Sequence, residues 1–335
     1  MKNIKKIKKA LLLLLVTLIV LYFIIKDDIP NILDSLKSAN PLYLIIGIGF
    51  AFLYWLFKAL ALHGIVNNYK RIKRKSILKQ TIITQFFHGI TPFASGGQPM
   101  QVYMLKKSGI KIAHSTNIIV QNFLLYQMAL ITHGIIAVLL NFKFNYIVNN
   151  VILRDLTILG FTINALVGLG LLIVSFSEKF NNIVLNVLIW IFTKIKILKN
   201  KERAIERFRN KIGEFHESAI ILRQHKMIII RGYIFNMIGL LCYYLTPLFV
   251  FYSLGINISP LIVYVCCSYV SIIGSFVPIP GGSGGIEYSF LQFFGGFVTG
   301  AVLSATVILW RSITYYLAMI LGGLLFTTFK GAKSK

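Results

Sequence analysis

The sequence is poor in acidic residues and in cysteine. It has 10 Asp and Glu against 35 Lys and Arg among 335 residues, and charged residues of both signs make up only 13% of the chain. A soluble domain is nearer one quarter charged, so the composition argues against a soluble globular protein. Cys242, Cys266 and Cys267 lie in apolar stretches without CxxC or Cys/His metal spacing, which indicates packing residues.

Catalytic motifs are missing as well. The sequence contains no HExxH or P-loop GKS/GKT pattern, and Glu287 is the one acid within its apolar runs. A hydrolase or transferase needs a nucleophile with a base, a pair of carboxylates or a metal. We therefore expect no catalytic residues, no metal site and no cofactor, and a function in transport.

The sequence is rich in long hydrophobic runs. Hydrophobic residues make up 56% of the chain, and the mean hydropathy is +0.75. Several runs reach about 18 residues, enough for a helix to cross about 30 Å of hydrocarbon. They are continuous, without the alternation of a β-barrel strand, so they predict helices. The expected fold is an all-α polytopic membrane protein, with residues 1–335 as one membrane domain.

The basic residues cluster along the chain. Of the 35 Lys and Arg, 29 fall in the segments 1–9, 69–79, 106–111, 179–231 and 330–335. This distribution follows the positive-inside rule, so it predicts cytoplasmic loops and gives no indication of nucleic-acid binding. We expect a multi-pass protein of a bacterial-type plasma membrane, with both termini cytoplasmic and with anionic membrane lipids as partners.

About six full spans are expected. They cover residues 10–25, 41–66, 115–140, 156–176, 227–253 and 301–328. No small-x-small cleavage site follows the first run, so it is expected to remain as an uncleaved span. In the cytoplasmic segment 178–226, apolar residues recur in steps of three and four between Ile205 and Leu222. This spacing predicts an amphipathic helix on the membrane surface or on the bundle.

Two segments rich in glycine and proline interrupt the apolar pattern. Residues 76–105 have basic residues at both ends, so they predict a re-entrant hairpin that enters from the cytoplasm. Residues 254–300 begin and end outside by the same parity, which predicts a second hairpin from the opposite face. If the hairpins cross the membrane instead, the chain has eight spans.

The two breaks share the pattern P-x-x-S-G-G, which predicts an inverted repeat; two unrelated glycine-rich loops are the alternative. Paired breaks of this kind point to the binding site of a transporter. Glycines let the backbone approach a ligand, and free N–H groups at helix N-termini suit a phosphate. The candidate lipid-binding residues are Pro92, Ser95, Gly96, Gly97, Gln98, Gly281, Gly282, Ser283, Gly284, Gly285, Glu287 and Arg311.

Three ionisable residues stand inside apolar runs and need partners. We expect the charges of Glu287 and Arg311 to lie within about 4–6 Å of each other. Arg311 then binds a lipid phosphate with Glu287 as its resting partner, or the two form a purely structural ion pair. Lys58 is expected to extend toward the membrane surface along its long stem, with a headgroup contact as the alternative.

Polar side chains are frequent in the first hairpin. They either line a polar cavity or form hydrogen bonds between helices. They are Gln85, His88, Thr91, Ser95, Gln98 and Gln101.

At its two glycine breaks the sequence resembles the flippase-like membrane domain of bacterial lysylphosphatidylglycerol synthases, the multiple peptide resistance factors, in stand-alone form. The matching residues are Thr91-Pro92, Gly96-Gly97-Gln98-Pro99, Pro280–Glu287 and Arg311. Gln98 departs from the family, which more often has an acid there, so the resemblance implies no acidic role at this position.

The resemblance implies translocation of an anionic or aminoacylated phospholipid, or of a similar polar lipid, between leaflets. The alternative is a membrane-embedded lipid-modifying enzyme of the phosphatidylglycerol lysyltransferase type, or a non-catalytic partner of one. The expected partners are the phospholipid substrate and either a second copy of the chain or a separate synthase protein.

Overall fold

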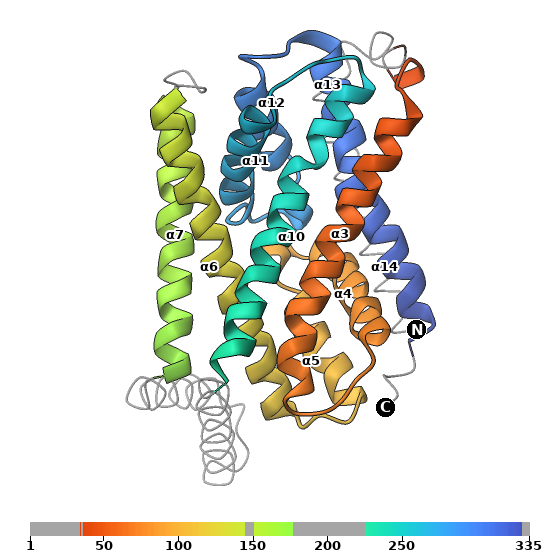
Figure 1. The fold of residues 1–335 in the computed structure, drawn as a ribbon, viewed down its shortest axis with the longest axis vertical. Helices are drawn as coiled ribbons and strands as arrows, with labels where there is room; N and C mark the ends of the chain where they lie inside the picture. Colours follow the sequence, from red (N-terminus) through yellow and green to blue (C-terminus); the bar gives the residue numbers. More distant parts are fainter. Residues whose placement is uncertain (1–33, 35, 145–150, 177–224, 330–335) are drawn as a thin grey trace, which may run out of the picture.

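The computed structural model describes residues 34, 36–144, 151–176 and 225–329. Every regular element in these ranges is a helix, so this part of the chain is all-α, as predicted. The long helices lie side by side in an elongated bundle (Figure 1).

Five helices of the described residues are long and apolar enough to cross a membrane. They coincide with five of the predicted spans, and they identify the chain as a polytopic membrane protein. They are α3 (Pro41–Asn67), α6 (Ile112–Phe144), α7 (Val151–Phe176), α10 (Lys226–Ser253) and a last helix formed by α13 (Gly300–Arg311), the π-helical turn η4 (Ser312–Tyr316) and α14 (Leu317–Thr327).

Two predicted segments lie outside the described residues. These are the first span, 10–25, and the amphipathic segment 178–226. The total of about six spans therefore stays a prediction.

Two pairs of short helices occupy the glycine-rich breaks. In the lower half of Figure 1, α4 (Arg74–Gly89) and α5 (Gly97–Lys107) are joined through the 3-10 turn η2 (Pro92–Ala94). In the upper half, α11 (Pro260–Gly274) and α12 (Gly285–Phe294) are joined through η3 (Pro280–Gly282). The turns η2 and η3 contact each other, so the two pairs meet tip to tip inside the bundle.

The two halves of the chain repeat the same order of elements at a nearly constant spacing. Pro280 follows Pro92 by 188 residues (280 minus 92), and the same step leads from the starts of α5 and α6 to the starts of α12 and α13. The turns also share a backbone conformation. Phe93 has φ 53° and ψ 21°, and its counterpart Gly281 has φ 64° and ψ 10°. The two turns therefore begin alike and differ at the following serine, which is helical at Ser95 (ψ -18°) and extended at Ser283 (ψ 141°).

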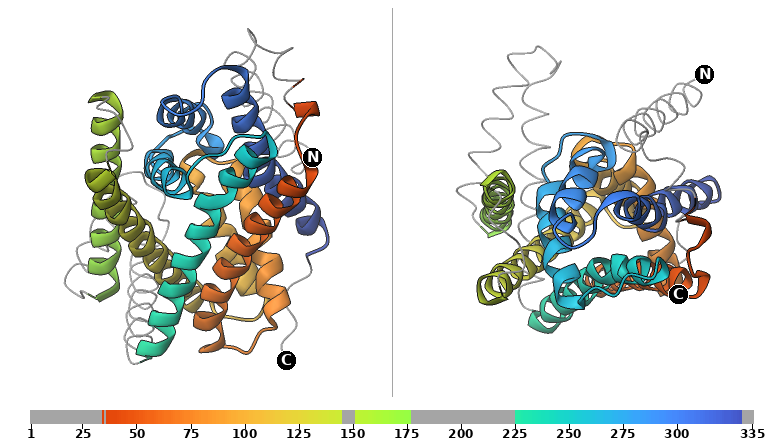
Figure 2. Two further views of the ribbon diagram at one scale, coloured as in Figure 1. Left: turned by 45° about the horizontal axis from the view of Figure 1, so that its top comes forward. Right: turned by 90° about the horizontal axis from the view of Figure 1, so that it is seen from above.

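Close packing holds the two halves together. Helices α3 and α10 run along one side of the bundle, seen from above in the right-hand view of Figure 2, and they contact each other along their length. Gly239 of α10 permits this approach, because a Cβ there would lie 3.2 Å from the Cβ of Phe57. Small residues at helix crossings are the usual means of association in lipid, where apolar burial alone gives no driving force.

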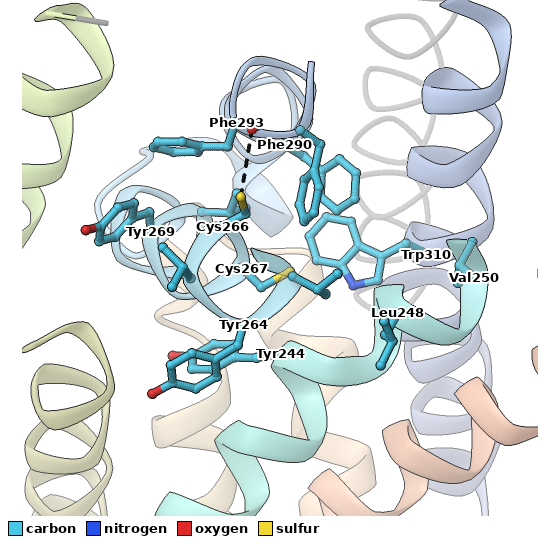
Figure 3. Packing of buried hydrophobic residues seen from close by; sticks show 14 of the residues in the cluster. Tyr244, Leu248, Val250, Tyr264, Cys266, Cys267, Tyr269, Phe290, Phe293 and Trp310 are labelled. Atoms are coloured by element: carbon cyan, nitrogen blue, oxygen red, sulfur yellow. Dashed lines mark hydrogen bonds between the residues drawn. The ribbon is translucent and has the colours of Figure 1, made fainter. Parts of the chain in front are cut away.

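An aromatic cluster fixes the second helix pair against α10 and α13 (Figure 3). The rings of Phe290 and Trp310 stack with their centroids 4.7 Å apart, and Phe251 and Phe294 pack at 5.1 Å. All four side chains are fully buried or nearly so. Such ring pairs contribute about 0.5–1.5 kcal/mol each beyond the area they bury, so α12 is held firmly in the bundle.

Charge is distributed unequally between the two ends of the bundle. The α3–α4 connection carries Lys70, Arg71 and Lys73, and Lys106 and Lys107 end α5. The α3–α4 connection and the C-terminal end of α5 both lie at the lower end of the bundle in Figure 1. At the upper end, the described charges of the α6–α7 region and of the segment before α3 include both signs: Asp34, Lys37, Lys143, Arg154 and Asp155.

Candidate functional site

The second break is a turn that only glycine can form easily. Pro280 opens it, and Gly281, Gly282 and Gly284 follow with φ of 64°, 64° and 84°. These angles are costly for a residue with a Cβ. The backbone N–H of Gly284 donates to Oε2 of Glu287 at 2.7 Å. This bond satisfies a free N–H at the start of α12 with a negative charge, which the helix N-terminus favours.

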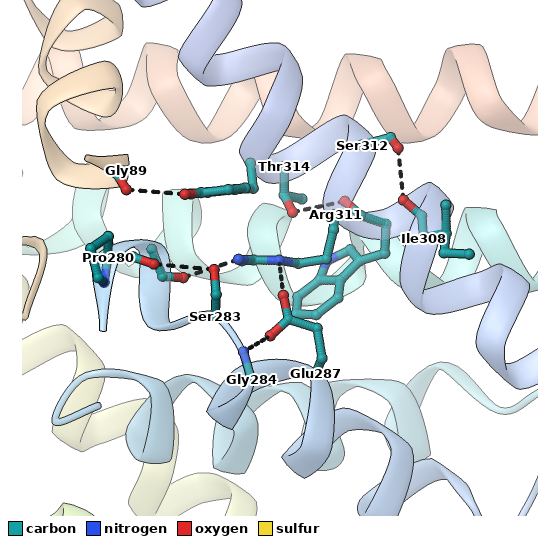
Figure 4. A network of polar contacts seen from close by, with 12 residues as sticks. Gly89, Pro280, Ser283, Gly284, Glu287, Ile308, Arg311, Ser312 and Thr314 are labelled. Carbon is teal, nitrogen blue, oxygen red and sulfur yellow. Dashed lines mark hydrogen bonds and ion pairs between the residues drawn. The ribbon is translucent and has the colours of Figure 1, made fainter. Parts of the chain in front are cut away.

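Glu287 and Arg311 form a buried ion pair (Figure 4). Nε of Arg311 lies 2.7 Å from Oε1 of Glu287, and the two residues are 2% and 0% exposed. Nη2 of Arg311 also donates to the carbonyl oxygen of Gly281 at 3.0 Å. The predicted pairing is therefore confirmed. Both groups are engaged with the turn and with each other, and neither lines the cavity described below.

Tyr315 connects Arg311 to the first break. Its ring centroid lies 4.1 Å from Cζ of Arg311, and its hydroxyl donates to the carbonyl oxygen of Gly89 at 3.0 Å. A Cβ on Gly281 would collide with this ring, so the glycine is needed for close approach as well as for its φ. Sequence reasoning did not identify Tyr315, although it follows Arg311 by four residues, which places both on one helix face.

The first break starts with the same left-handed backbone as the second, but without glycine at those positions. Phe93 and Ala94 adopt φ of 53° and 51°, a region that residues with a Cβ rarely occupy. Oγ1 of Thr91 accepts from the N–H of Gly96 at 2.8 Å and donates to the carbonyl oxygen of Phe87 at 2.7 Å. These bonds stabilise a strained turn of the kind that is found at ligand sites.

Two more contacts complete this turn. The ring of His88 bonds through Nδ1 to the carbonyl oxygen of Ala94, and it packs so closely on Gly97 that a Cβ there would overlap it. Oγ of Ser95 donates to the carbonyl oxygen of Pro92 at 2.8 Å. Pro92, Ser95, Gly96 and Gly97 therefore build the turn.

A polar cavity of about 310 Å³ lies beside the first turn, between α3, α4, α5, α6 and α7. Four of the six polar residues predicted in the first hairpin line it, namely Gln85, His88, Gln98 and Gln101, so the cavity interpretation is confirmed for them. The lining also includes Tyr54, Lys58, Thr81, Thr84, Phe93, Ala94, Ile119, Asn122, Phe123, Tyr126, Gln127, Ile163, Asn164, Val167 and Ser275.

Lys58 is the one lysine or arginine among the described residues of the lining. Its ammonium donates to Oη of Tyr54 at 3.3 Å and lies 5.1 Å and 5.0 Å from the ring centroids of Tyr54 and Tyr126. The expected extension toward the membrane surface is therefore wrong. Two aromatic rings hold the ammonium inside the bundle by cation–π contact, where it faces the cavity.

Amide side chains tie the far wall of the cavity together. Nε2 of Gln127 donates to Oδ1 of Asn164 at 3.1 Å, and Nδ2 of Asn164 donates to Oγ of Ser275 at 2.7 Å. These bonds connect α6, α7 and the end of α11. Other lining groups have no hydrogen-bond partner among the described residues. These are Oγ1 of Thr81, Oε1 of Gln98 and Oδ1 of Asn122.

The predicted lipid-binding residues thus fall into two groups. Gln98 lines the cavity beside the turn that Pro92, Ser95, Gly96 and Gly97 build. Glu287, Arg311 and the turn Gly281–Gly285 form a closed network across the tip contact, and none of them lines the cavity. Ser283 is buried, and its hydroxyl donates to the carbonyl oxygen of Pro280 at 3.1 Å.

Comparison with known proteins identifies relatives over most of the chain. A family model described as the lysylphosphatidylglycerol synthase TM region matches residues 10–322. A UPF0104 membrane protein of Archaeoglobus fulgidus is 29% identical over 316 residues, which cover 86% of this chain and 87% of the relative. A UPF0104 membrane protein of Methanothermobacter thermautotrophicus is 21% identical over 305 residues, with 86% of each chain covered.

Proposed function

Since this chain belongs to the family of lysylphosphatidylglycerol synthase TM regions, we propose that it moves an anionic or aminoacylated phospholipid, or a similar polar lipid, between membrane leaflets. The observation that carries the proposal is the polar cavity that holds Lys58 beside the meeting point of two helix pairs. A polar, charged cavity inside an apolar bundle is costly to maintain and marks the path of a polar substrate.

In this proposal the two helix pairs are opposed re-entrant hairpins of an inverted repeat. The end of the bundle that carries Lys70, Arg71, Lys106 and Lys107 faces the cytoplasm, as the positive-inside rule requires. The first hairpin then enters from the cytoplasm and the second from outside, and their tips meet at mid-depth. Non-helical backbone at that depth is tolerated because it is enclosed by protein and lines a cavity.

The cavity gives the headgroup a substitute for water. A phosphate at mid-membrane needs a countercharge and hydrogen-bond donors, because an isolated charge there costs several kcal/mol. Lys58 supplies the charge, and the side chains of Gln85, Gln98, Gln101 and Asn122 supply neutral polar contacts. The acyl chains remain in the bilayer while the headgroup passes.

For Glu287 and Arg311 we propose a positioning role. Their ion pair, the bond to Gly281 and the contact with Tyr315 hold the second tip against the first. Lipid contact is then assigned to Lys58, to Gln98 and to the backbone of the first turn.

The enzymatic alternative lacks support in the cavity. A lipid-modifying enzyme needs a nucleophile and a base or paired acids close to the headgroup. Within the described lining, His88, Lys58, Tyr54 and Tyr126 could exchange a proton, but no acid or cysteine accompanies them. The arrangement therefore favours translocation.

Reconstitution tests the proposal directly. The full-length protein is placed in liposomes with traces of fluorescent phosphatidylglycerol, lysylphosphatidylglycerol or phosphatidylethanolamine, and dithionite is added to bleach the outer leaflet. We expect the inner-leaflet pool of at least one lipid to become accessible. Lys58→Gln should slow this transfer about tenfold or more, because the headgroup loses its countercharge.

Lys107→Gln is the matched control. Lys107 also contacts a tyrosine ring, at 5.2 Å from the centroid of Tyr103, but it is exposed at the end of α5 and outside the cavity. The Lys107→Gln variant should transfer lipid at the wild-type rate. Transfer no faster than in protein-free liposomes for every lipid would refute the proposed function.

A further inference from the structure

We infer that the cavity selects phospholipids whose headgroup is anionic and carries hydroxyl groups, and that it discriminates against cationic aminoacyl headgroups. The inference rests on the proposed function and specifies its substrate class. Three features of the described residues carry it: the charge of the lining, the placement of the acids, and the character of the remaining polar groups.

The charge of the lining favours an anion. Lys58 contributes a positive charge, and no acid among the described lining residues offsets it. The singly charged phosphodiester of phosphatidylglycerol is neutralised by this ammonium. A lysyl ester of the same lipid adds two ammonium groups, so its headgroup is net positive and is repelled by Lys58. Like charges in a confined polar site oppose binding strongly.

The acids that could accept an ammonium group are placed elsewhere. Among the described residues, Asp34 pairs with Lys37 and Asp155 with Arg154, both pairs being exposed. Glu287 is committed to Arg311 and to the N–H of Gly284. An aminoacyl headgroup in the cavity would therefore bring buried ammonium groups without a carboxylate from the described part of the chain.

The uncharged polar groups suit hydroxyls. Oγ1 of Thr81, Oε1 of Gln98 and Oδ1 of Asn122 have no hydrogen-bond partner among the described residues. Thr81 is buried, with 2% exposure, so its hydroxyl needs a partner inside the cavity. The amide and hydroxyl side chains of the cavity can each donate and accept a hydrogen bond. A glycerol hydroxyl of the headgroup can do the same, so it can pair with these side chains in either direction.

The walls of the cavity match a lipid better than a soluble phosphate ester. Phe93 and Val167 belong to the lining and are 57% and 39% exposed, so the cavity wall extends to the outer surface of the bundle through apolar side chains. A headgroup bound inside thus has an apolar border where its acyl chains can remain in contact with the membrane.

Four probes in one assay test the inference. Proteoliposomes carry fluorescent phosphatidylglycerol, lysylphosphatidylglycerol, phosphatidylcholine or phosphatidylmethanol, which is anionic but has no headgroup hydroxyl. We expect phosphatidylglycerol to be transferred at least about tenfold faster than the lysyl ester, from like-charge repulsion. It should also be transferred several-fold faster than phosphatidylmethanol, from the lost hydroxyl contacts. Glycerol phosphate trapped inside should not escape; its release would show that a soluble phosphate is the substrate.

Variants that change the charge of the cavity provide a second test in the same lipid-transfer assay. Lys58→Glu should reverse the preference, so that the lysyl ester is transferred faster than phosphatidylglycerol, while Lys58→Arg should retain the wild-type order. Lys107→Glu, the matched exposed change, should leave the order unaltered. If Lys58→Glu does not fold, Lys58→Gln should still bring the two rates close together.

The results of these assays distinguish a failure of the inferred substrate preference from a failure of the proposed function. Transfer of the lysyl ester at a rate equal to or above that of phosphatidylglycerol by the wild-type protein overturns the inference and leaves the proposed function intact. Transfer of no lipid refutes the proposed function, and the inference with it. Equal rates for phosphatidylglycerol and phosphatidylmethanol refute the hydroxyl part alone.

Discussion

A single carboxylate and a single guanidinium face each other where the second turn meets the last helix. Arg311 uses Nε for Glu287, Nη2 for the carbonyl oxygen of Gly281 and its flat face for Tyr315. Lysine could not form all three contacts, because it has one point charge and no planar fork. In a buried pair, each charge is tolerated because the other is present.

Neutralising one partner should therefore be more harmful than neutralising both. Glu287→Gln leaves the Arg311 charge buried without a countercharge, and we expect a loss of about 3–5 kcal/mol in folding stability. The double variant, Glu287→Gln with Arg311→Met, should recover most of that loss. Thermal unfolding of the purified proteins in detergent measures the stability of the single and the double variant. A double variant as unstable as Glu287→Gln alone would contradict this account.

Residue by residue, the sequence was informative where chemistry is local. The cost of a charge in an apolar run predicted the pairing of Glu287 with Arg311, and the Gly and Pro spacing predicted both turns. The position of Lys58 was missed, because the rings that hold it come from α3 and α6 and the cavity is built by at least five helices. Tyr54 is a local partner, four residues before Lys58 on α3, but no local pattern encodes the contact with Tyr126 or the cavity.

Among the secondary-structure elements, the contact between the two tips links the two short-helix pairs to each other. The hydroxyl of Tyr315, in η4, reaches the carbonyl oxygen of Gly89, 226 positions earlier in the chain. No spacing rule could have predicted this bond, whereas the first helix pair falls in a segment where basic residues at both ends predicted a hairpin. Two rigid helix pairs joined by few contacts are suited to move against each other.

Tyr315→Phe should weaken that link without unfolding the protein. Loss of one hydrogen bond should cost about 1 kcal/mol of stability, but the lipid-transfer rate should change several-fold if tip contact controls access to the cavity. Tyr316→Phe is the control, because the hydroxyl of Tyr316 has no partner among the described residues. Equal transfer rates for both variants and the wild type would argue against a role for the tip contact.

For the whole molecule, the distribution of charge predicts the orientation in the membrane. The α3–α4 connection contains Lys73 and lies at the basic end, whereas Arg154 lies at the other end on α7. Positive residues are retained in the cytoplasm. The helix order and the five described spans were predictable from hydropathy alone, because lipid requires each backbone to satisfy its own hydrogen bonds.

Cysteine labelling tests this orientation. A cysteine at Lys73 should react with a membrane-impermeant maleimide only after cells are opened, and a cysteine at Arg154 should react in intact cells. The native Cys242, Cys266 and Cys267 are buried, so background labelling of these cysteines by the maleimide should be low. Reaction of both engineered positions from the same side would exclude the proposed topology.

Under the proposed function, the unequal chemistry of the two turns has a consequence for the side of the membrane that the resting cavity faces. Phe93 and Ala94 stand where the other half has Gly281 and Gly282, and the π-helical turn η4 has no counterpart in the regular helix α6. Two identical halves would give inward-facing and outward-facing forms of equal free energy, and the protein would rest equally in both. Because the halves differ, we expect the proposed transporter to favour one form in the absence of substrate and to present its cavity preferentially to one leaflet.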